Sequence, residues 1–594
     1  MENKTHSTSS VQACQNCKKD FVIESEDFSF YEKIKVPAPT FCPKCRGQRR
    51  MMWRNEHNLF KKTDAHSGEK VFSAYSEDSK VKVYNNDFWW SDNWEAADYG
   101  KEYDFSRPFF DQFLDLLHLV PLPARVNANA IHSDYSNNAG SLKNCYLCFN
   151  GNAAEDCFYG INFNNVKKCI NFSSSSTSEE CGDVCNITDC YKVFMTTDAA
   201  DCVDVSYSFD CRNCSNCVGC VGLRHKNYHI FNLPYSKEEY FKIKAELDLG
   251  SYTSHKKIIQ NVADLIEKHP RKYMHTMKSI NISGDYVFGS KNVKHTFMSY
   301  HGYDVKYSQQ VRNTTDTHDT TVTLEVEGPM YESVACGIHA SDLKFCFECH
   351  PSNIDLSYCI FCSSSSHLFG CVGLRKKEYC ILNKQYSKEE YFEMLEKIKK
   401  QIDELPYTDY RGCVYKFGEF FPPEFSPFSY NDTIVQEYFP LTKELASELK
   451  YNWRDYDKKS PEATILNDMI EDDIKDVPDS YVEELLECAD RETCGHNCSK
   501  VFKITTFELS FYKKNLIPIP RKCPNCRHYD RIQHRNLEYL ALYKRSCMCG
   551  GAGSPQVTGN HGHEGKCEVE FETSYSPDRP EIVYCEKCYQ QEVY

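Results

Sequence analysis

Closely spaced pairs of cysteines near both ends of the chain constrain its fold more than any other feature. Two short hairpins that each present two thiolates suit a tetrahedral Zn²⁺, with Zn–S bonds of roughly 2.3 Å. Four thiolates leave no open position, so such a site is structural rather than catalytic. In each predicted ribbon 24 residues separate the two pairs: Cys14 and Cys17 from Cys42 and Cys45, and Cys494 and Cys498 from Cys523 and Cys526.

The two ends are copies of one module, because their resemblance extends beyond the cysteines. FVIESEDFSFYEK at 21–33 matches FKITTFELSFYKK at 502–514, and both predict a strand at SFY followed by a Pro-x-Pro turn. After the second pair, CPKCRGQRRMMWRN parallels CPNCRHYDRIQHRN. We therefore predict a zinc-ribbon module over 1–100 and a second one over 488–594.

The C-terminal module carries further cysteines that predict a second zinc site, which brings the expected total to about three zinc ions. The predicted ligands are Cys547, Cys549, Cys585 and Cys588. Alternative ligands are Cys567, His561 and His563. The N-terminal copy has Asp64, His66, Asn85 and Phe88 at the matching positions. There we expect packing by Trp89, Trp90 and Trp94 in place of the metal.

A basic row follows the second cysteine pair in each module. Residues 1–62 hold 12 Lys and Arg against 7 Asp and Glu, and residues 494–545 hold 11 against 3, although the whole chain has a net charge of −15. Spacings of three and four place several cations on one helical face. Such a row can contact RNA phosphates, or its stems can cover the ribbon and pair with nearby carboxylates. The candidate nucleic-acid contacts are Arg46, Arg49, Arg50, Arg54, Arg527, Arg531, Arg535, Lys544 and Arg545.

Between the modules, short strand-like units recur about every 12 residues, as at Cys145, Cys157 and Cys169. Such a unit is too small to fold alone and must stack on its neighbours. We therefore predict a Cys-rich parallel β-solenoid in two halves, with about two units per coil. VGCVGLRHKNYHIFNLPYSKEEYF at 218–241 matches FGCVGLRKKEYCILNKQYSKEEYF at 369–392, so both halves end in a helix that begins with a Ser-x-x-Glu capping box.

The predicted fold is thus multidomain and mainly β, with duplicated ribbons flanking the two solenoid halves and a few linking helices. GEFFPPEFSPFSYND cannot be helical through Pro422 and Pro423, so we expect an extended arm that buries its phenylalanines; exposed, it would be a docking motif. The predicted segments between the modules are a helical linker (101–143), the first solenoid half (144–249), a helical connector (250–283), the second half (284–402) and the arm with acidic helices (403–487).

One cysteine run in the first half has spacing close to that of iron–sulfur proteins. Cys211, Cys214, Cys217 and Cys220 follow one another at intervals of three residues. The second half matches only Cys220, at Cys371, and no Cys-Pro follows. Packing at the corners of the solenoid is therefore favoured over a cluster or a further zinc ion.

Several motifs together resemble a family of large zinc-ribbon proteins that recurs in bacteria of the candidate phyla radiation. They are CPKCRGQRRMMWRNE, WWSDNW, YSKEEYF, GEFFPPEFSPFSYN, QEYFPLTKE, RKCPNCRH and TSYSPDRPEIVYCEKCYQ, spread over nearly the whole chain. The resemblance implies zinc binding through the matching cysteines and a bacterial source, and it implies no particular activity. The chain departs from the family where three residues separate Cys494 from Cys498 instead of two.

The functional prediction follows from what the sequence contains and lacks. Without a signal peptide or a long apolar run, the chain is expected to be cytoplasmic. It has no Gly-rich phosphate loop, HExxH or GxSxG, so we expect no enzyme. The favoured function is a zinc-binding scaffold that contacts RNA or a ribonucleoprotein through its basic ribbons. The alternatives are a protein–protein adaptor using the solenoid face and the Phe/Pro arm, and, less favoured, a carbohydrate-active enzyme.

Overall fold

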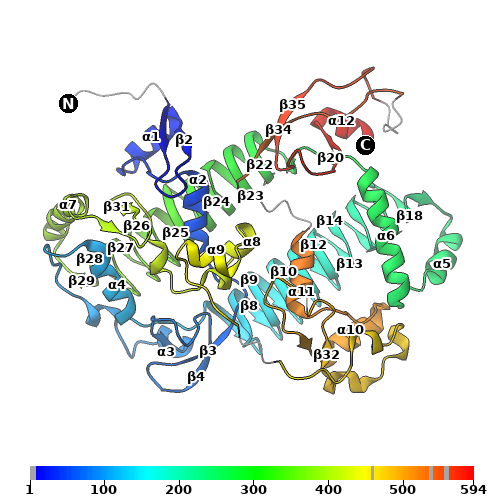
Figure 1. Cartoon of the computed structure of the whole chain (residues 1–594), viewed down its shortest axis with the longest axis horizontal. Coiled ribbons are helices and arrows are strands. Elements are labelled where there is room, and N and C mark those ends of the chain that lie inside the picture. The colour runs from blue at the N-terminus through cyan, green and yellow to red at the C-terminus, as the bar shows by residue number, and fades with distance from the viewer. Residues whose placement is uncertain (1–8, 457–459, 492, 534–539, 554–560, 594) are drawn as a thin grey trace.

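A computed structural model describes residues 9–456, 460–491, 493–533, 540–553 and 561–593. The chain is mainly β, and most of its strands belong to two parallel-rich sheets, called here the first stack and the second stack (Figure 1). The first stack contains β7 (Asn127–Ile131), β8 (Ser136–Lys143), β9 (Tyr146–Glu155), β10 (Phe158–Lys167), β11 (Ile170–Glu179), β12 (Gly182–Thr188), β13 (Tyr191–Phe194), β14 (Thr197–Ala200), β15 (Val203–Ser206), β16 (Phe209–Arg212), β17 (Ser215–Val218), β18 (Asn227–Ile230) and β19 (Leu233–Pro234). The second stack contains β21 (Thr276–Met277), β22 (Ile280–Phe288), β23 (Lys291–Lys306), β24 (Gln309–Val326), β25 (Met330–Lys344), β26 (Ile354–Ser357), β27 (Ser366–Phe369), β28 (Glu378–Ile381) and β29 (Lys384–Gln385).

Residues 12 apart lie side by side in the parallel pairs of the first stack, and residues 11 to 14 apart do so in the second. Phe158 pairs in parallel with Ile170, which pairs with Gly182. A left-handed backbone conformation recurs at every third residue, as at Tyr159 and Asn162, and bends the chain at short intervals. The prediction of about two units per coil is therefore wrong, because the pairing offset is 12 residues and two units would require 24.

Small buried thiols fill the inside of the first stack. Cys157, Cys169 and Cys181 are fully buried on successive units, and the Cys169 Sγ donates to the carbonyl oxygen of Ser178, nine residues along the chain, at 3.6 Å. Cysteine here acts as a small apolar group with a weak donor. The run from Cys211 to Cys220 is buried in the same way, and each thiol bonds a backbone carbonyl nine residues further on. These contacts agree with packing rather than a metal cluster.

Each stack ends in an antiparallel hairpin followed by a helix. The hairpins are β18–β19 and β28–β29. The helices are α5 (Lys237–Glu246) and α7 (Lys388–Glu404), and both begin with the predicted capping box. Helix α6 (Tyr252–Lys268) then leads toward the second stack, and α4 (Phe109–Leu119) precedes the first. No helix in the described residues is long and apolar enough to cross a membrane.

The two end modules share one order of elements. The N-terminal module contains β1 (Ser10–Ala13), β2 (Asp20–Ile23), α1 (Ser25–Lys33), α2 (Pro43–Met51), β3 (Phe60–Thr63), β4 (Lys70–Ser73), β5 (Val83–Tyr84) and α3 (Asn86–Trp90). The C-terminal module contains β32 (Leu486–Glu487), β33 (Val501–Phe502), α10 (Thr506–Asn515), α11 (Pro524–Gln533), β34 (Tyr543–Ser546), β35 (Glu570–Thr573), β36 (Val583–Tyr584) and α12 (Glu586–Val593). The predicted SFY strand is wrong, because this motif lies in α1 and α10, which capping boxes at Glu24 and Thr505 initiate.

Each module contacts both stacks: one of its strands pairs with the strand that leads into one stack, and one of its helices packs on the other stack. Strand β5 pairs with β6 (Leu122–Pro123), which leads into the first stack, whereas α2 packs on β24 and β25 of the second. Conversely, β36 pairs with β20 (Arg271–Lys272), which leads into the second stack, whereas α11 packs on β11 and β12 of the first (Figure 1). The duplicated modules therefore connect the two stacks to each other.

The Pro- and Phe-rich arm is an internal part of the fold. Phe420, Phe421 and Phe425 are almost completely buried and Phe428 is largely so, which confirms the expected burial. Phe421 stacks on Phe113 of α4, with ring centroids 4.7 Å apart. The arm is therefore not an exposed docking motif. It leads into the short helices α8 (Val435–Tyr438) and α9 (Lys443–Glu448), and α9 lies in the first of the two acidic segments expected to be helical. The second, 465–477, forms 3₁₀ turns instead of an α-helix.

Candidate metal centres and the cleft between the stacks

The N-terminal ribbon gathers four thiols at the start of α2. Their sulfur atoms all lie within 4.8 Å of one another: Cys14, Cys17, Cys42 and Cys45. The backbone N–H of Cys42 donates to the Cys14 Sγ at 3.2 Å, and hydrogen bonds from the Cys42 and Cys45 thiols lower the pKa of Cys14. A thiolate that accepts a backbone N–H in a set of four suits structural Zn²⁺.

The C-terminal ribbon is built from a different first cysteine than the sequence suggested. Here the group of four is Cys488, Cys498, Cys523 and Cys526. The N–H of Cys523 donates to the Cys488 Sγ at 3.2 Å, which repeats the bond from Cys42 to Cys14. Cys494 lies in the insertion between Cys488 and Cys498, with its Sγ 3.4 Å from that of Cys526. The structure thus places Cys494 beside the set as a fifth thiol.

Cys488 was not predicted as a ligand because the prediction rested on closely spaced cysteine pairs, and Cys488 is not part of such a pair. The usable signal was the preceding strand, since LEC at 486–488 occupies the place of QAC at 12–14. Each cysteine directly follows a strand that pairs with the next strand. Cys14 follows β1, which pairs with β2, and Cys488 follows β32, which pairs with β33. The insertion only lengthens the hairpin.

A second group of four thiols lies in the C-terminal module, with three cysteines buried and Cys567 partly buried. It consists of Cys547, Cys567, Cys585 and Cys588. The N–H of Cys585 donates to the Cys547 Sγ at 3.2 Å, and burial raises the pKa of Cys547 to about 12. The structure therefore joins Cys567 to three of the predicted ligands, and the fourth, Cys549, belongs to a neighbouring group.

That neighbouring group combines two thiols with two imidazoles. The Cys549 Sγ lies 3.1 Å from His561 Nδ1 and 3.6 Å from His563 Nε2, which is 3.3 Å from the Cys588 Sγ. The other ring nitrogens have partners, because His561 Nε2 lies 2.9 Å from Glu592 and His563 Nδ1 lies 3.1 Å from the carbonyl of Gly565. Such outer partners are typical of metal-binding histidines.

At the equivalent position in the N-terminal module, hydrogen bonds and stacked rings replace the thiols. The Asp64 carboxylate accepts hydrogen bonds from Ser67 at 2.7 Å and from Asn85 at 3.0 Å. His66 stacks on Phe88 with ring centroids 3.7 Å apart. Trp89 and Trp94 are buried as expected, whereas half of Trp90 is exposed. Hydrogen bonds and ring stacking thus fasten the hairpin here.

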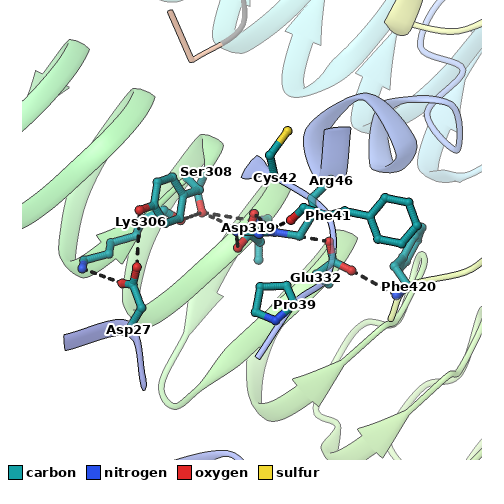
Figure 2. A network of polar contacts seen from close by, with 12 residues as sticks. Asp27, Pro39, Phe41, Cys42, Arg46, Lys306, Ser308, Asp319, Glu332 and Phe420 are labelled. Carbon is teal, nitrogen blue, oxygen red and sulfur yellow. Dashed lines mark hydrogen bonds and ion pairs between the residues drawn. The ribbon is translucent and has the colours of Figure 1, made fainter. Parts of the chain in front are cut away.

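The basic row of the N-terminal module is buried, which contradicts its predicted exposure to RNA. Arg46, Arg49, Arg50 and Arg54 each expose at most 3% of their surface. Arg46 forms a two-pronged contact with Asp319 of β24, at 3.0 and 2.7 Å (Figure 2). The other three contact buried carboxylates of the second stack and the arm: Glu332, Glu348 and Glu419. Arg46, Arg49 and Arg50 pair with these acids because α2, which carries them, packs on β24 and β25, whereas Arg54 follows the helix.

The C-terminal row repeats this arrangement on the first stack. Arg527 is buried and donates to Asn171 at 2.9 Å, and Arg531 is buried 3.9 Å from Asp183. Arg535 lies outside the described residues. Of the remaining predicted contacts, Arg545 donates to the carbonyl of Ser576 at 3.2 Å, and Lys544 is exposed. The two arginine rows are therefore docking contacts between modules and stacks.

The two stacks face each other across a cleft of about 740 Å³. Its walls carry amide and aromatic side chains, among them Asn150, Asn162 and Asn164 from the first stack and Tyr300, Gln310 and Arg312 from the second. The stacks touch where Asn150 donates to Gln310 at 3.3 Å and where Tyr286 donates to Asp198 at 3.2 Å. Among the described lining residues, the formal charges are one arginine, Arg312, and one aspartate, Asp285.

Comparison with protein-family models and with curated proteins finds no match for this chain. The geometry alone therefore supports metal binding by cysteine groups at both ends of the chain.

Proposed function

We propose that this protein is a zinc-dependent, non-enzymatic adaptor that binds an extended peptide segment of a partner protein in the cleft between its stacks. In this proposal both stacks are β-solenoids with one 12-residue unit per coil, and their facing sides form the binding surface. The observation that carries the proposal is the composition of the cleft. Amide side chains both donate and accept hydrogen bonds, so they complement the N–H and C=O groups of a peptide backbone.

The zinc ions hold the binding surface together. We infer that Zn²⁺ fills both ribbons and the group around Cys547, and that the group around Cys549 takes a fourth ion that shares the Cys588 thiolate. Each ribbon helix contacts one stack while its module extends the other. Loss of zinc would release these helices, so the width of the cleft depends on the metal.

The charge of the cleft favours a peptide over RNA. Binding to single-stranded RNA rests on cations along the phosphate backbone together with stacking on aromatic rings. The described lining residues offer aromatic rings but a single arginine, and that arginine lies over the Tyr300 ring at 5.5 Å. The arginines of the N-terminal row, which would have contacted phosphates, are engaged with Asp319, Glu332 and neighbouring acids.

The test uses the full, zinc-loaded chain and two probes, a phage-displayed library of short random peptides and a labelled single-stranded RNA of mixed sequence. Selected peptides are then measured by fluorescence anisotropy. Asn164, half-buried on the cleft wall, is replaced by Trp to fill the cleft. The matched control is Asn227→Trp, at an exposed asparagine of β18 that is not among the lining residues.

The proposal expects Asn164→Trp to weaken peptide binding at least about tenfold, or about 1.4 kcal/mol, and Asn227→Trp to leave it unchanged. Peptides that bind both variants equally would show that the cleft is not the site. Salt-sensitive RNA binding without any selected peptide would favour the RNA scaffold instead. Metal analysis of the purified chain tests the zinc sites separately.

A further inference from the structure

Three residues from separate parts of the chain converge where the two ribbon modules meet. His57 follows α2 of the N-terminal module, His528 lies in α11 of the C-terminal module, and Glu437 lies in α8. Helix α8 is fixed to the N-terminal module, since the N–H of Ile434 donates to the carbonyl of Arg54 at 3.0 Å. The site therefore joins three segments, the nearest two of which are 91 residues apart in sequence.

The donor atoms of these residues are spaced as ligands of one ion. His528 Nε2 lies 3.1 Å from Glu437 Oε1, and His57 Nδ1 lies 3.7 Å from the same oxygen. The two imidazole rings have centroids 4.9 Å apart. With metal–ligand bonds of roughly 2.0–2.2 Å, three donors at these separations can surround a single cation.

One of these atoms lacks the partner that burial normally requires. His57 Nδ1 is inaccessible to solvent and makes no hydrogen bond, because 3.7 Å to the carboxylate is too long for one. A buried nitrogen without a hydrogen bond is energetically unfavourable, and a bound cation would supply the missing partner. The side chains expose only 15% (His57), 10% (His528) and 5% (Glu437) of their surface, so this is a built, largely enclosed cluster.

We propose that His57, His528 and Glu437 form a site for a divalent first-row transition metal with at least one open coordination position. Two imidazoles and one carboxylate are the donor set of open zinc and non-haem iron sites, in contrast to the closed cysteine groups. The neighbouring Tyr438 lines the cleft, so the ion lies beside its wall. This inference does not depend on what the cleft binds.

The experiment is a Co²⁺ titration of the full chain after Zn²⁺ has been added only in the amount that saturates the thiol sites, whose soft thiolate ligands take zinc in preference to a site of imidazoles and a carboxylate. The proposal expects one further equivalent of cobalt, with visible ligand-field absorption but without new thiolate-to-cobalt charge-transfer absorption. Cobalt that enters a cysteine group carries the charge-transfer band, which separates the two kinds of site. The combined His57→Gln and Glu437→Gln variant should lose this equivalent and keep its zinc content.

The matched control removes a histidine–glutamate pair that is exposed on the second stack. His339 and Glu327 lie 3.2 Å apart with both side chains largely exposed, and their conversion to glutamine should leave the cobalt equivalent in place. The proposal is overturned if the unmodified chain takes up no thiolate-free cobalt, a result that needs no variant. It is also overturned if the combined His57→Gln and Glu437→Gln variant still binds this cobalt. If that variant does not fold, His528→Gln takes its place, and cobalt binding by His528→Gln overturns the proposal in the same way.

Discussion

The replacement of Arg46 by Met tests whether the arginine row holds the N-terminal module onto the second stack. The Asp319 carboxylate is completely buried and receives two hydrogen bonds from Arg46, at 3.0 and 2.7 Å, and one from Arg50, at 3.2 Å. Arg46 also donates to the carbonyl of Phe41 at 2.7 Å. In Arg46→Met the Asp319 carboxylate keeps only the guanidinium of Arg50 as a charged partner. The buried ion pairs around Asp319 are then left with one more negative than positive charge compared with the unmodified chain.

The expected magnitude follows from that excess charge. Removing one partner of a buried ion pair costs about 3–5 kcal/mol, because the remaining charge stays desolvated. Since each 1.4 kcal/mol is a factor of ten, the equilibrium constant for opening this contact should rise roughly a hundredfold to several thousandfold. Combining Arg46→Met with Asp319→Leu removes both charges, so most of the loss should be recovered.

Hydrogen–deuterium exchange of the zinc-loaded full chain measures this opening locally, where a single unfolding free energy is not defined. The amides of α2 and β24 report on the contact, and those of β10 serve as an internal reference. The control is Lys33→Met, which removes the ion pair between the exposed Lys33 and the partly buried Asp316 and should cost at most about 1 kcal/mol. The reasoning fails if Arg46→Met changes protection less than tenfold, or if the double variant is no better protected than the single one.

Three further predictions concern the metal groups and pH. Cys488→Ser should lose the ribbon zinc, whereas Cys494→Ser should keep it, and metal analysis of both variants decides which thiol is the ligand. Cys588→Ser should lose two zinc ions, because this thiol belongs to two groups; loss of a single ion would show that it is not shared. Burial lowers the pKa of His275, but Asp285 at 2.9 Å raises it, with a net pKa above the ordinary 6.5. The stabilisation by this pair is therefore present below pH 6.5 and is lost as the pH rises through the raised pKa. Protection of the β22 amides, taken relative to exchange of an unfolded peptide at the same pH, should therefore fall there, and His275→Gln should remove this fall.

Much of the fold could be predicted from short stretches of sequence because their signals are local. A cysteine pair with two intervening residues, a Ser-x-x-Glu capping box and a cysteine every 12 residues each reflect contacts within one hairpin, one turn or neighbouring units. The same kind of signal was available at SFY, where Thr505 and Glu508 form a capping box, although the interpretation as a strand overlooked it. The 12-residue period likewise indicated stacking, but the number of units per coil depended on the backbone angle at every third residue.

Sequence alone determined that this chain repeats one cysteine module at both ends and places stacked 12-residue units between them. Tertiary structure decided which residues of these modules and units contact one another. Arg46 and Asp319 are 273 residues apart, so no local pattern could reveal that the basic row faces buried acids instead of solvent. The choice of Cys488 over Cys494 and the meeting of His57 with His528 have the same origin. The sequence determines the charge and the donor atoms of a side chain. Its exposure to solvent and its contact partners depend on the segments that fold against it.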